Sequence, residues 1–218
     1  MNIELMLNAQ RELDERIMSE HQVDGKETFK NLMVALQVEL AEMANESRFF
    51  KYWSEDQSPR TALYTFTGNH GWEYQAYADP REDAEVAEFF GFDPAYAIKK
   101  ENPLLEEYVD ALHFFLSIAI RKGWEQALDV RVGQMNVAPG DLNLLYLDLV
   151  YFLNASYREE DNPTTDYKGM SKNEVLFHYA WLNFVVMGLQ HFNFSVSEIE
   201  AAYYEKNEKN HARQEAGY

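Results

Sequence analysis

Two pairs of acidic residues interrupt stretches that otherwise have the pattern of buried helices. The first pair is Glu39 and Glu42, and the second is Glu107 and Asp110. Residues three apart on an α-helix project from the same face, so each pair sets two carboxylates side by side on a surface that should be core. Four such groups cannot all stay ionised without cations between them. Carboxylate oxygens suit Mg²⁺ or Mn²⁺, so the pattern predicts a metal site for a phosphate-bearing substrate.

A plainer explanation of the acidic pairs also exists. A single pair of this kind on a helix is usually a solvated face or half of a salt bridge. That explanation is weaker for the second pair, because Asp110 and His113 lie among Ala111, Leu112 and the run 114–116. An ionised group in such apolar surroundings needs a partner or a metal. On the residues alone, metal binding and a structural role stand about equal.

Composition narrows the classes of protein and of partner. The 218 residues are 46% hydrophobic and carry a net charge of -18, with no basic footprint, so we expect no nucleic-acid partner. The chain has no cysteine, which excludes a disulfide framework. Its first residues are amphipathic and charged, unlike a signal peptide, and its longest apolar run, 111–120, is too short for a bilayer. We therefore expect a cytoplasmic protein without a membrane partner.

Hydrophobic periodicity and capping signals predict an all-α chain. The expected helices cover residues 2–20, 27–53, 103–122, 141–156, 171–191 and 195–210. An aromatic-rich insertion at about 55–102 separates the second helix from the third. Within it, 61–66 and 72–77 are β-prone and flank a glycine-containing turn, which predicts a hairpin, and 79–90 predicts a short helix. Without repeats or long linkers, residues 1–218 are expected to form one domain.

Three further sets of residues fit nucleotide binding as well as plainer roles. An amide can pair with a base edge, a cation beside an aromatic ring can form a nucleotide rim, and cations on one helical face can grip phosphates. Each set also has a plainer explanation, namely a surface glutamine, the end of an amphipathic helix and a frayed, charged tail. The sets are Gln10; Lys51 and Trp53; and Lys206, Asn210 and Arg213. No P-loop or nucleophile elbow is present, so a covalent nucleophile has no support.

In combination these motifs resemble a known family. The segments 38–46, 50–53, 105–114 and 206–218 together are similar to the dimeric, all-α dUTPase family, within the wider all-α NTP pyrophosphohydrolase group that includes MazG-like enzymes. The acidic pairs alone indicate only the wider group. Phe114, the Lys51-x-Trp53 segment and the C-terminal tail narrow it to dUTPases. The 64 residues between Glu42 and Glu107 depart from the family, whose usual connection is shorter.

The resemblance implies a fold, a reaction and an oligomeric state. It implies a helical bundle of the pyrophosphohydrolase type, assembled as a homodimer, that converts dUTP and dUDP to dUMP. It implies Mg²⁺, with Mn²⁺ as a substitute, and attack by a metal-activated water. The implied metal ligands are Glu39, Glu42, Glu107 and Asp110. Glu46, on the same helix face, is a candidate to orient or deprotonate the water.

The resemblance also assigns substrate contacts residue by residue. Gln10 and Trp53 correspond to the residues at the uracil, and Asp110 with Phe114 to the check on the deoxyribose, with the phenyl ring filling the space of a 2′-hydroxyl. The implied substrate-binding set is Gln10, Lys51, Trp53, His113, Phe114, Lys206, Asn210, Arg213 and Tyr218. Two alternatives stay open. One is a related dCTPase or house-cleaning NTP pyrophosphohydrolase, and the other is a non-enzymatic acidic helical protein that binds a partner.

Overall fold

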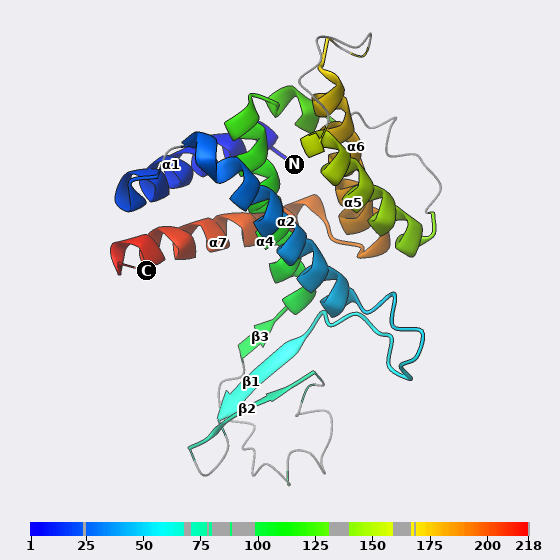
Figure 1. Ribbon diagram of the computed structural model, residues 1–218. Coiled ribbons are helices and arrows are strands. Elements are labelled where there is room, and N and C mark those ends of the chain that lie inside the picture. The colour runs from blue at the N-terminus through cyan, green and yellow to red at the C-terminus, as the bar shows by residue number, and fades with distance from the viewer. Residues whose placement is uncertain are drawn as a thin grey trace.

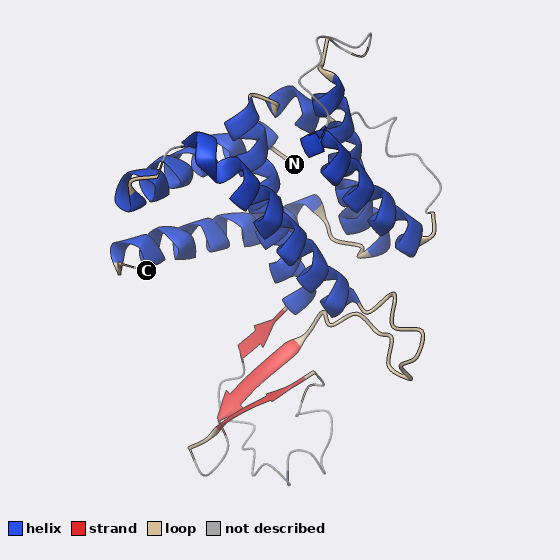
Figure 2. Ribbon diagram, in the orientation of Figure 1, coloured by secondary structure: helices blue, strands red, loops and turns tan. Residues whose placement is uncertain are grey.

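The computed structural model describes residues 1–23, 25–67, 71–77, 79, 88, 99–130, 140–158, 167 and 169–217. Its architecture is helical with a small sheet at one end, which confirms the predicted all-α class (Figures 1 and 2). Two helices precede the sheet, namely α1 (Ile3–His21) and α2 (Gly25–Ser47). The helices that follow it are α4 (Pro103–Lys122), α5 (Leu142–Arg158), α6 (Lys172–Val186) and α7 (Val196–Glu215). A 3₁₀ turn, η1 (Glu125–Leu128), follows α4, and a π-helical turn, η3 (Met187–His191), follows α6.

Helix α4 lies at the centre of the described fold. It begins where the Asn102 side chain accepts a hydrogen bond from the Leu105 amide at 3.0 Å, with Pro103 in its first turn. It ends at Gly123, whose φ of 68° is the left-handed conformation that closes a helix. Helix α2 packs along α4, α1 and α7 contact each other and α4, and α5 pairs with α6 (Figure 1). The central position of α4 explains its nearly all-round apolar sequence.

Aromatic rings in the core fix the position of α4. Tyr108 stacks on Phe184 of α6 with ring centroids 4.2 Å apart, and both rings are fully buried. Phe115, two turns further along α4, contacts the same Phe184 at 4.8 Å between centroids. Tyr108 also lies against Gly188 in η3, where an added Cβ would come within 2.5 Å of the ring. This packing holds the turn of α4 that carries Glu107 and Asp110.

The insertion contains a three-stranded antiparallel sheet. Its strands are β1 (Leu63–Thr67), β2 (Glu73–Ala76) and β3 (Lys99–Glu101), in the order β2-β1-β3, so the predicted hairpin is confirmed. Strand β3 was not predicted, because its charged sequence carries no β signal and it is a strand only by pairing with the open edge of β1. The expected helix over 79–90 falls almost wholly outside the described residues.

Two helix boundaries differ from the sequence prediction. Helix α2 ends at Ser47 and not at 53, because Arg48 has a left-handed backbone with φ of 60°. The Arg48 guanidinium donates to the Asp56 carbonyl at 2.6 Å and to the Ser54 hydroxyl at 3.1 Å, which holds the chain in a loop after the helix. Helix α7 continues past 210 to Glu215. Among the described residues, no helix is long and apolar enough to cross a membrane.

Candidate active site

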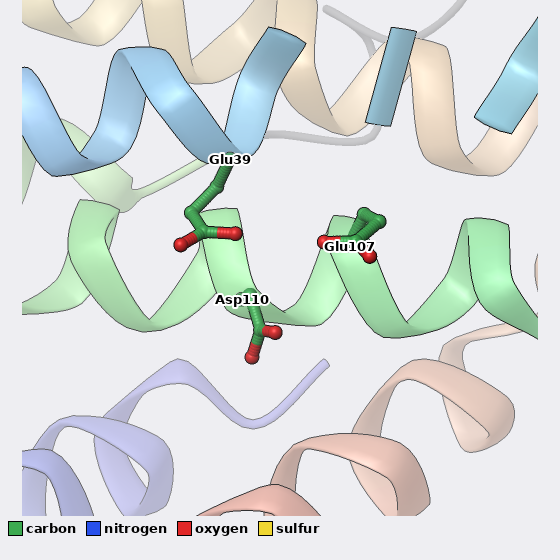
Figure 3. A group of neighbouring side chains, drawn as sticks. All are labelled: Glu39, Glu107 and Asp110. Carbon is green, nitrogen blue, oxygen red and sulfur yellow. The ribbon is translucent and has the colours of Figure 1, made fainter. Parts of the chain in front are cut away.

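Three of the predicted metal ligands meet where α2 packs on α4. Glu39 projects from α2, and Glu107 and Asp110 project from consecutive turns of α4 (Figure 3). One carboxylate oxygen from each lies within 4.8 Å of the others, and all three side chains are half-buried. We call Glu39, Glu107 and Asp110 the acidic cluster. Three carboxylates this close are mutually repulsive when ionised and offer hard oxygen donors to a divalent cation.

The electrostatics of the acidic cluster follow from burial and like charge. Burial raises the pKa of Glu39 to about 7, with further contributions from the charges of Asp110 and Glu42. Burial likewise raises the pKa of Glu107 to about 7, and Asp110, Glu42 and Glu39 add to the effect. The pKa of Asp110 is raised as well, chiefly by burial, although hydrogen bonding to Lys206 opposes the rise. Such displaced values are typical of functional sites.

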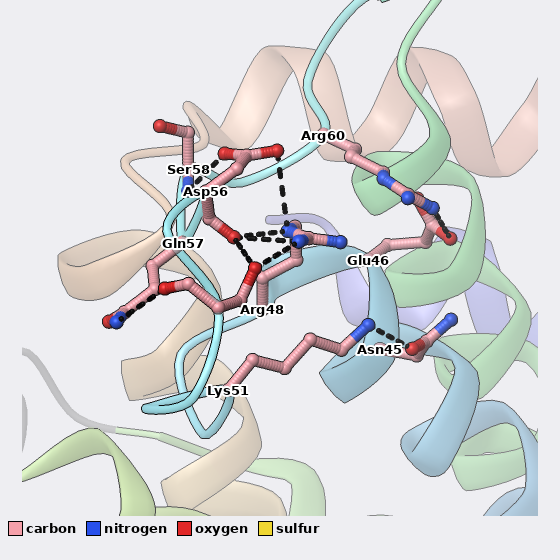
Figure 4. Close-up of polar contacts among 9 residues, drawn as sticks. Asn45, Glu46, Arg48, Lys51, Asp56, Gln57, Ser58 and Arg60 are labelled. Carbon is pink, nitrogen blue, oxygen red and sulfur yellow. Dashed lines mark hydrogen bonds and ion pairs between the residues drawn. The ribbon is translucent and has the colours of Figure 1, made fainter.

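The two remaining glutamates of α2 lie apart from this cluster. Glu42 is exposed and is not among the three grouped carboxylates, although its charge acts on Glu39 and Glu107. Glu46 forms an ion pair with Arg60 at 3.3 Å, and its Oε2 is shielded without a hydrogen-bond partner among the described residues (Figure 4). The roles of Glu42 as a ligand and of Glu46 at the water therefore stay predictions.

A cavity of about 350 Å³ opens beside the acidic cluster. Glu39 and Asp110 form part of its wall, and Phe114, one turn beyond Asp110 on α4, contributes its ring. The cavity is bounded on its other sides by α1 and by α7. The structure thus brings seven of the predicted substrate contacts to one hollow, namely Gln10, His113, Phe114, Lys206, Asn210 and Arg213, together with Asp110.

The C-terminal residues at this cavity form an ordered helix face. Lys206 bonds to Asp110 Oδ2 at 2.6 Å and to Glu106 Oε1 at 3.1 Å, so its ammonium group lies against the acidic cluster. Arg213 Nη1 donates to Asn210 Oδ1 at 3.4 Å one turn further along α7. These three residues line the cavity together. Their common helix face, which the spacing predicted, therefore borders the cavity beside the acidic cluster, and their role in binding phosphates stays a prediction.

Gln10 is the centre of a buried polar network. Its Nε2 donates to Asp14 Oδ1 at 2.9 Å and to the Ser117 hydroxyl at 3.0 Å. Its Oε1 accepts from the Tyr203 hydroxyl at 3.1 Å and lies 2.7 Å from His113 Nδ1. Because an amide oxygen only accepts, His113 Nδ1 carries a proton. Burial lowers the pKa of His113 to about 3, so the ring is neutral and its Nε2 is an acceptor.

Asp14 and Ser117 were missed in the sequence analysis. Both line the cavity, and the Ser117 hydroxyl donates to Asp14 Oδ1 at 2.9 Å. We call Gln10, Asp14, His113 and Ser117 the polar wall. A signal was available, since Asp14 follows Gln10 by four residues and Ser117 follows His113 by four, which places each pair on one helix face.

Lys51 and Trp53 lie in the loop after α2 and are not among the residues that line the cavity. The Lys51 ammonium donates to the Asn45 side chain, as Figure 4 shows. Trp53 is 65% exposed and packs edge-on against Phe50. Tyr218 lies outside the described residues. Within the described part of a single chain, therefore, the rim residues are not brought to the cavity, and their roles stay predictions.

A carboxylate cluster beside a cation-lined cavity in a helical fold suits a metal-dependent nucleotide hydrolase. In a comparison with protein-family models, the family described as dUTPase matches residues 2–65 and 87–218. The chain therefore belongs to the all-α dUTPase family. Its activity is that of a dUTP diphosphatase, a nucleoside triphosphate pyrophosphohydrolase, and its substrate is a nucleotide. The alternative of a non-enzymatic interaction protein is wrong.

The family match also locates the departure from the family pattern. The unmatched internal residues, 66–86, fall inside the insertion that carries the sheet. Both acidic pairs and the C-terminal tail lie in the matched ranges. A comparison with curated protein sequences finds no match.

Proposed function

We propose that this protein hydrolyses dUTP, and also dUDP, to dUMP in a Mg²⁺-dependent reaction, with Mn²⁺ as a substitute. The observation that carries the proposal is the convergence of Glu39, Glu107 and Asp110 within 4.8 Å. Two of these carboxylates, Glu39 and Asp110, line a cavity that is also lined by Lys206 and Arg213. Negative and positive groups thus share one hollow, as a metal-bound polyphosphate requires.

The acidic cluster fits a divalent cation. Glu39, Glu107 and Asp110 supply three oxygen donors at suitable spacing. Burial, with added like-charge repulsion, raises the pKa of Glu39 and of Glu107, and a bound cation would favour their ionised forms. Glu42, on the exposed side of the cluster, is the fourth proposed ligand. A bound cation supplies positive charge for phosphate oxygens and increases the acidity of a water molecule.

The chain's own residues position the nucleotide. Phe114, Lys206, Asn210 and Arg213 all line the cavity. In the proposal the ring of Phe114 fills the volume that a 2′-hydroxyl would need, and the other three bind phosphate oxygens through charge-assisted hydrogen bonds. Glu46, oriented by Arg60, is proposed to orient the attacking water. The water attacks phosphorus in line and dUMP forms, while pyrophosphate leaves from dUTP and orthophosphate leaves from dUDP. Catalysis then rests on positioning and electrostatics without a protein nucleophile.

We also propose a cytoplasmic homodimer. Large apolar side chains are exposed on α2 and on α5, where Val34 is 61% and Leu147 is 63% exposed. Val38 on α2 and Leu144 and Tyr151 on α5 extend this surface. Apolar and aromatic side chains of this kind are enriched at the buried centre of subunit interfaces. Light scattering at micromolar concentration tests the proposal, and a monomer would contradict it.

Steady-state hydrolysis measurements test the enzymatic proposal. The substrates are dUTP, dUDP, dCTP and UTP, each with Mg²⁺, with Mn²⁺ and with EDTA. We expect dUMP from dUTP and dUDP only when a divalent cation is present. A higher kcat/KM for dCTP than for dUTP would favour the dCTPase alternative. Undiminished turnover in EDTA, or in Glu39→Gln and Glu107→Gln, would contradict the assignment of the metal site.

A further inference from the structure

Lys206 lies between two hollows of the molecule. One is the cavity beside the acidic cluster, and the other is a smaller hollow of about 220 Å³ between β3, α4 and α7. The Lys206 side chain is 11% exposed, and its ammonium group donates to Asp110 Oδ2 at 2.6 Å and to Glu106 Oε1 at 3.1 Å. Asp110 lines the cavity, whereas Glu106 lines the smaller hollow. The ammonium group is therefore held from both sides.

Asp110 alone is a poor anchor for this ammonium group. Its carboxylate belongs to the acidic cluster and is one of the proposed cation ligands. A lysine and a divalent cation compete for the oxygens of one carboxylate, because the same negative charge attracts both. The ammonium group of a lysine is carried on a flexible four-carbon stem, so it moves when it loses its partner. A second carboxylate outside the acidic cluster removes this conflict.

Glu106 has the position that this role requires. It lies in the first turn of α4 and precedes Glu107 in the sequence. Consecutive residues of a helix point about 100° apart, so Glu107 joins the acidic cluster while Glu106 lines the other hollow. An ammonium group has three hydrogens. With one bonded to Glu106 and one to Asp110, Lys206 retains a third for a phosphate oxygen.

Two other carboxylates of the smaller hollow are paired with different lysines. Glu101 forms an ion pair with Lys99, and Glu205 forms one with Lys209 at 2.8 Å. Glu205 precedes the site lysine in the sequence, lines the same hollow as Glu106 and carries the same charge. It therefore provides a matched control for the loss of a negative charge at this place.

We infer that Glu106 is a positioning residue for the reaction, which holds the ammonium group of Lys206 at the cavity wall so that it can bind a phosphate oxygen while Asp110 serves the cation. Glu106 itself does not touch the substrate. The inference rests on the proposed function, in which Lys206 binds the phosphates. Charge alone would act in the opposite direction, because a carboxylate near the site repels a polyphosphate and its removal would improve substrate binding.

Steady-state kinetics with dUTP and Mg²⁺ test the inference. Glu106→Ala removes the acceptor, and Glu106→Gln keeps an acceptor oxygen without the charge; each is measured with Lys206 present and in the Lys206→Met background. We expect Glu106→Ala to raise KM about 3- to 10-fold with a smaller change in kcat, and Glu106→Gln to raise KM less. Neither should raise KM in the Lys206→Met background. The control Glu205→Ala should leave KM and kcat near their wild-type values.

Thermal unfolding in EDTA without nucleotide measures the contact independently of turnover. We expect Glu106→Ala to lower Tm by more when Lys206 is present than in the Lys206→Met background, because only the former protein has the ion pair to lose. Equal losses would show that the carboxylate acts only on the N-terminus of α4, and they would overturn the inference.

The kinetic outcomes separate the inference from the proposed function. A KM that stays constant or falls in Glu106→Ala, or that rises equally in the Lys206→Met background, would overturn the inference alone. Should Glu106→Ala fail to fold, Glu106→Gln carries the test, and a KM at or below the wild-type value would have the same meaning. Wild-type kcat/KM in Lys206→Met would instead contradict the phosphate contact of the proposed function, and the inference with it.

Discussion

Neutralising one member of the acidic cluster should stabilise the metal-free protein. Burial raises the pKa of Glu107 to about 7, and repulsion by the nearby charges of Asp110, Glu42 and Glu39 adds to the rise. The folded state therefore holds its proton more tightly than the unfolded chain. The favourable contribution is complete below pH about 4.5, the ordinary value for a glutamic acid, and is lost as the pH rises through about 7. Glu107→Gln removes that loss.

The size of the effect is modest because Glu107 is only half-buried. Solvent screening limits the cost of holding the ionised Glu107 carboxylate in the folded protein to about 1 kcal/mol at pH 8. For a chain of this length that corresponds to a rise in Tm of about 2–4 °C. At pH 5 the wild-type carboxyl is protonated, so the variant and the wild type should unfold at nearly the same temperature.

A divalent cation should reverse the comparison. Mg²⁺ at 100 times its dissociation constant stabilises the protein that binds it by about 2.7 kcal/mol. The wild type should then gain about 5–11 °C in Tm at pH 8. Glu107→Gln lacks one of the charged donors and should lose most of that gain. Protons and cation compete for the same oxygens, so the gain should shrink as the pH falls below 7.

These predictions are tested by measuring the Tm of the wild type and of Glu107→Gln at pH 5 and at pH 8, each in EDTA and in Mg²⁺. Glu15→Gln, an exposed residue of α1, is the control for a change in net charge and should follow the wild type throughout. A variant that is less stable than the wild type in EDTA at pH 8 would refute the argument that the ionised Glu107 carboxylate destabilises the folded protein. An undiminished response to Mg²⁺ would refute the assignment of Glu107 as a ligand.

Three further predictions concern the core, the sugar and the tail. Gly188→Ala should lower the Tm measured by thermal unfolding by about 2–12 °C, because the added Cβ would lie 2.5 Å from the buried Tyr108 ring and overpacking costs about 1–3 kcal/mol. An unchanged Tm would contradict this prediction. Phe114→Ala should raise the UTP to dUTP ratio of kcat/KM, and a fixed ratio in a folded variant would disprove the steric check. Arg213→Ala should lower kcat/KM for dUTP about 10- to 100-fold. Lys209 pairs with Glu205 on the same helix and its ammonium group is exposed, so the control variant Lys209→Ala should have little effect. Equal values of kcat/KM for the two variants would show that Arg213 does not contribute to substrate binding.

The sequence by itself determined the helices and the chemical character of the site. Periodic apolar residues and caps such as Ser171 and Ser195 predict helices without reference to tertiary contacts, because helical hydrogen bonds and caps are local. The acidic pairs on α2 and α4 were visible for the same reason, because residues three apart on one helix share a face whatever the helix packs against. Spacing on one helix also placed Lys206, Asn210 and Arg213 on a common face. The family motifs lie in these elements, so they were legible before the fold was known.

Only the tertiary structure decided which groups on those helices meet. Residues three apart on α2 share a face, yet α4 covers Glu39 and leaves Glu42 exposed, because a packed helix shields only part of its neighbour's circumference. The partners of Gln10 come from α1, α4 and α7, and no local pattern shows that they use its whole hydrogen-bonding capacity. Hydrogen bonds between distant helices depend on how the helices pack. That dependence left Asp14, which lines the cavity, unnoticed in the sequence.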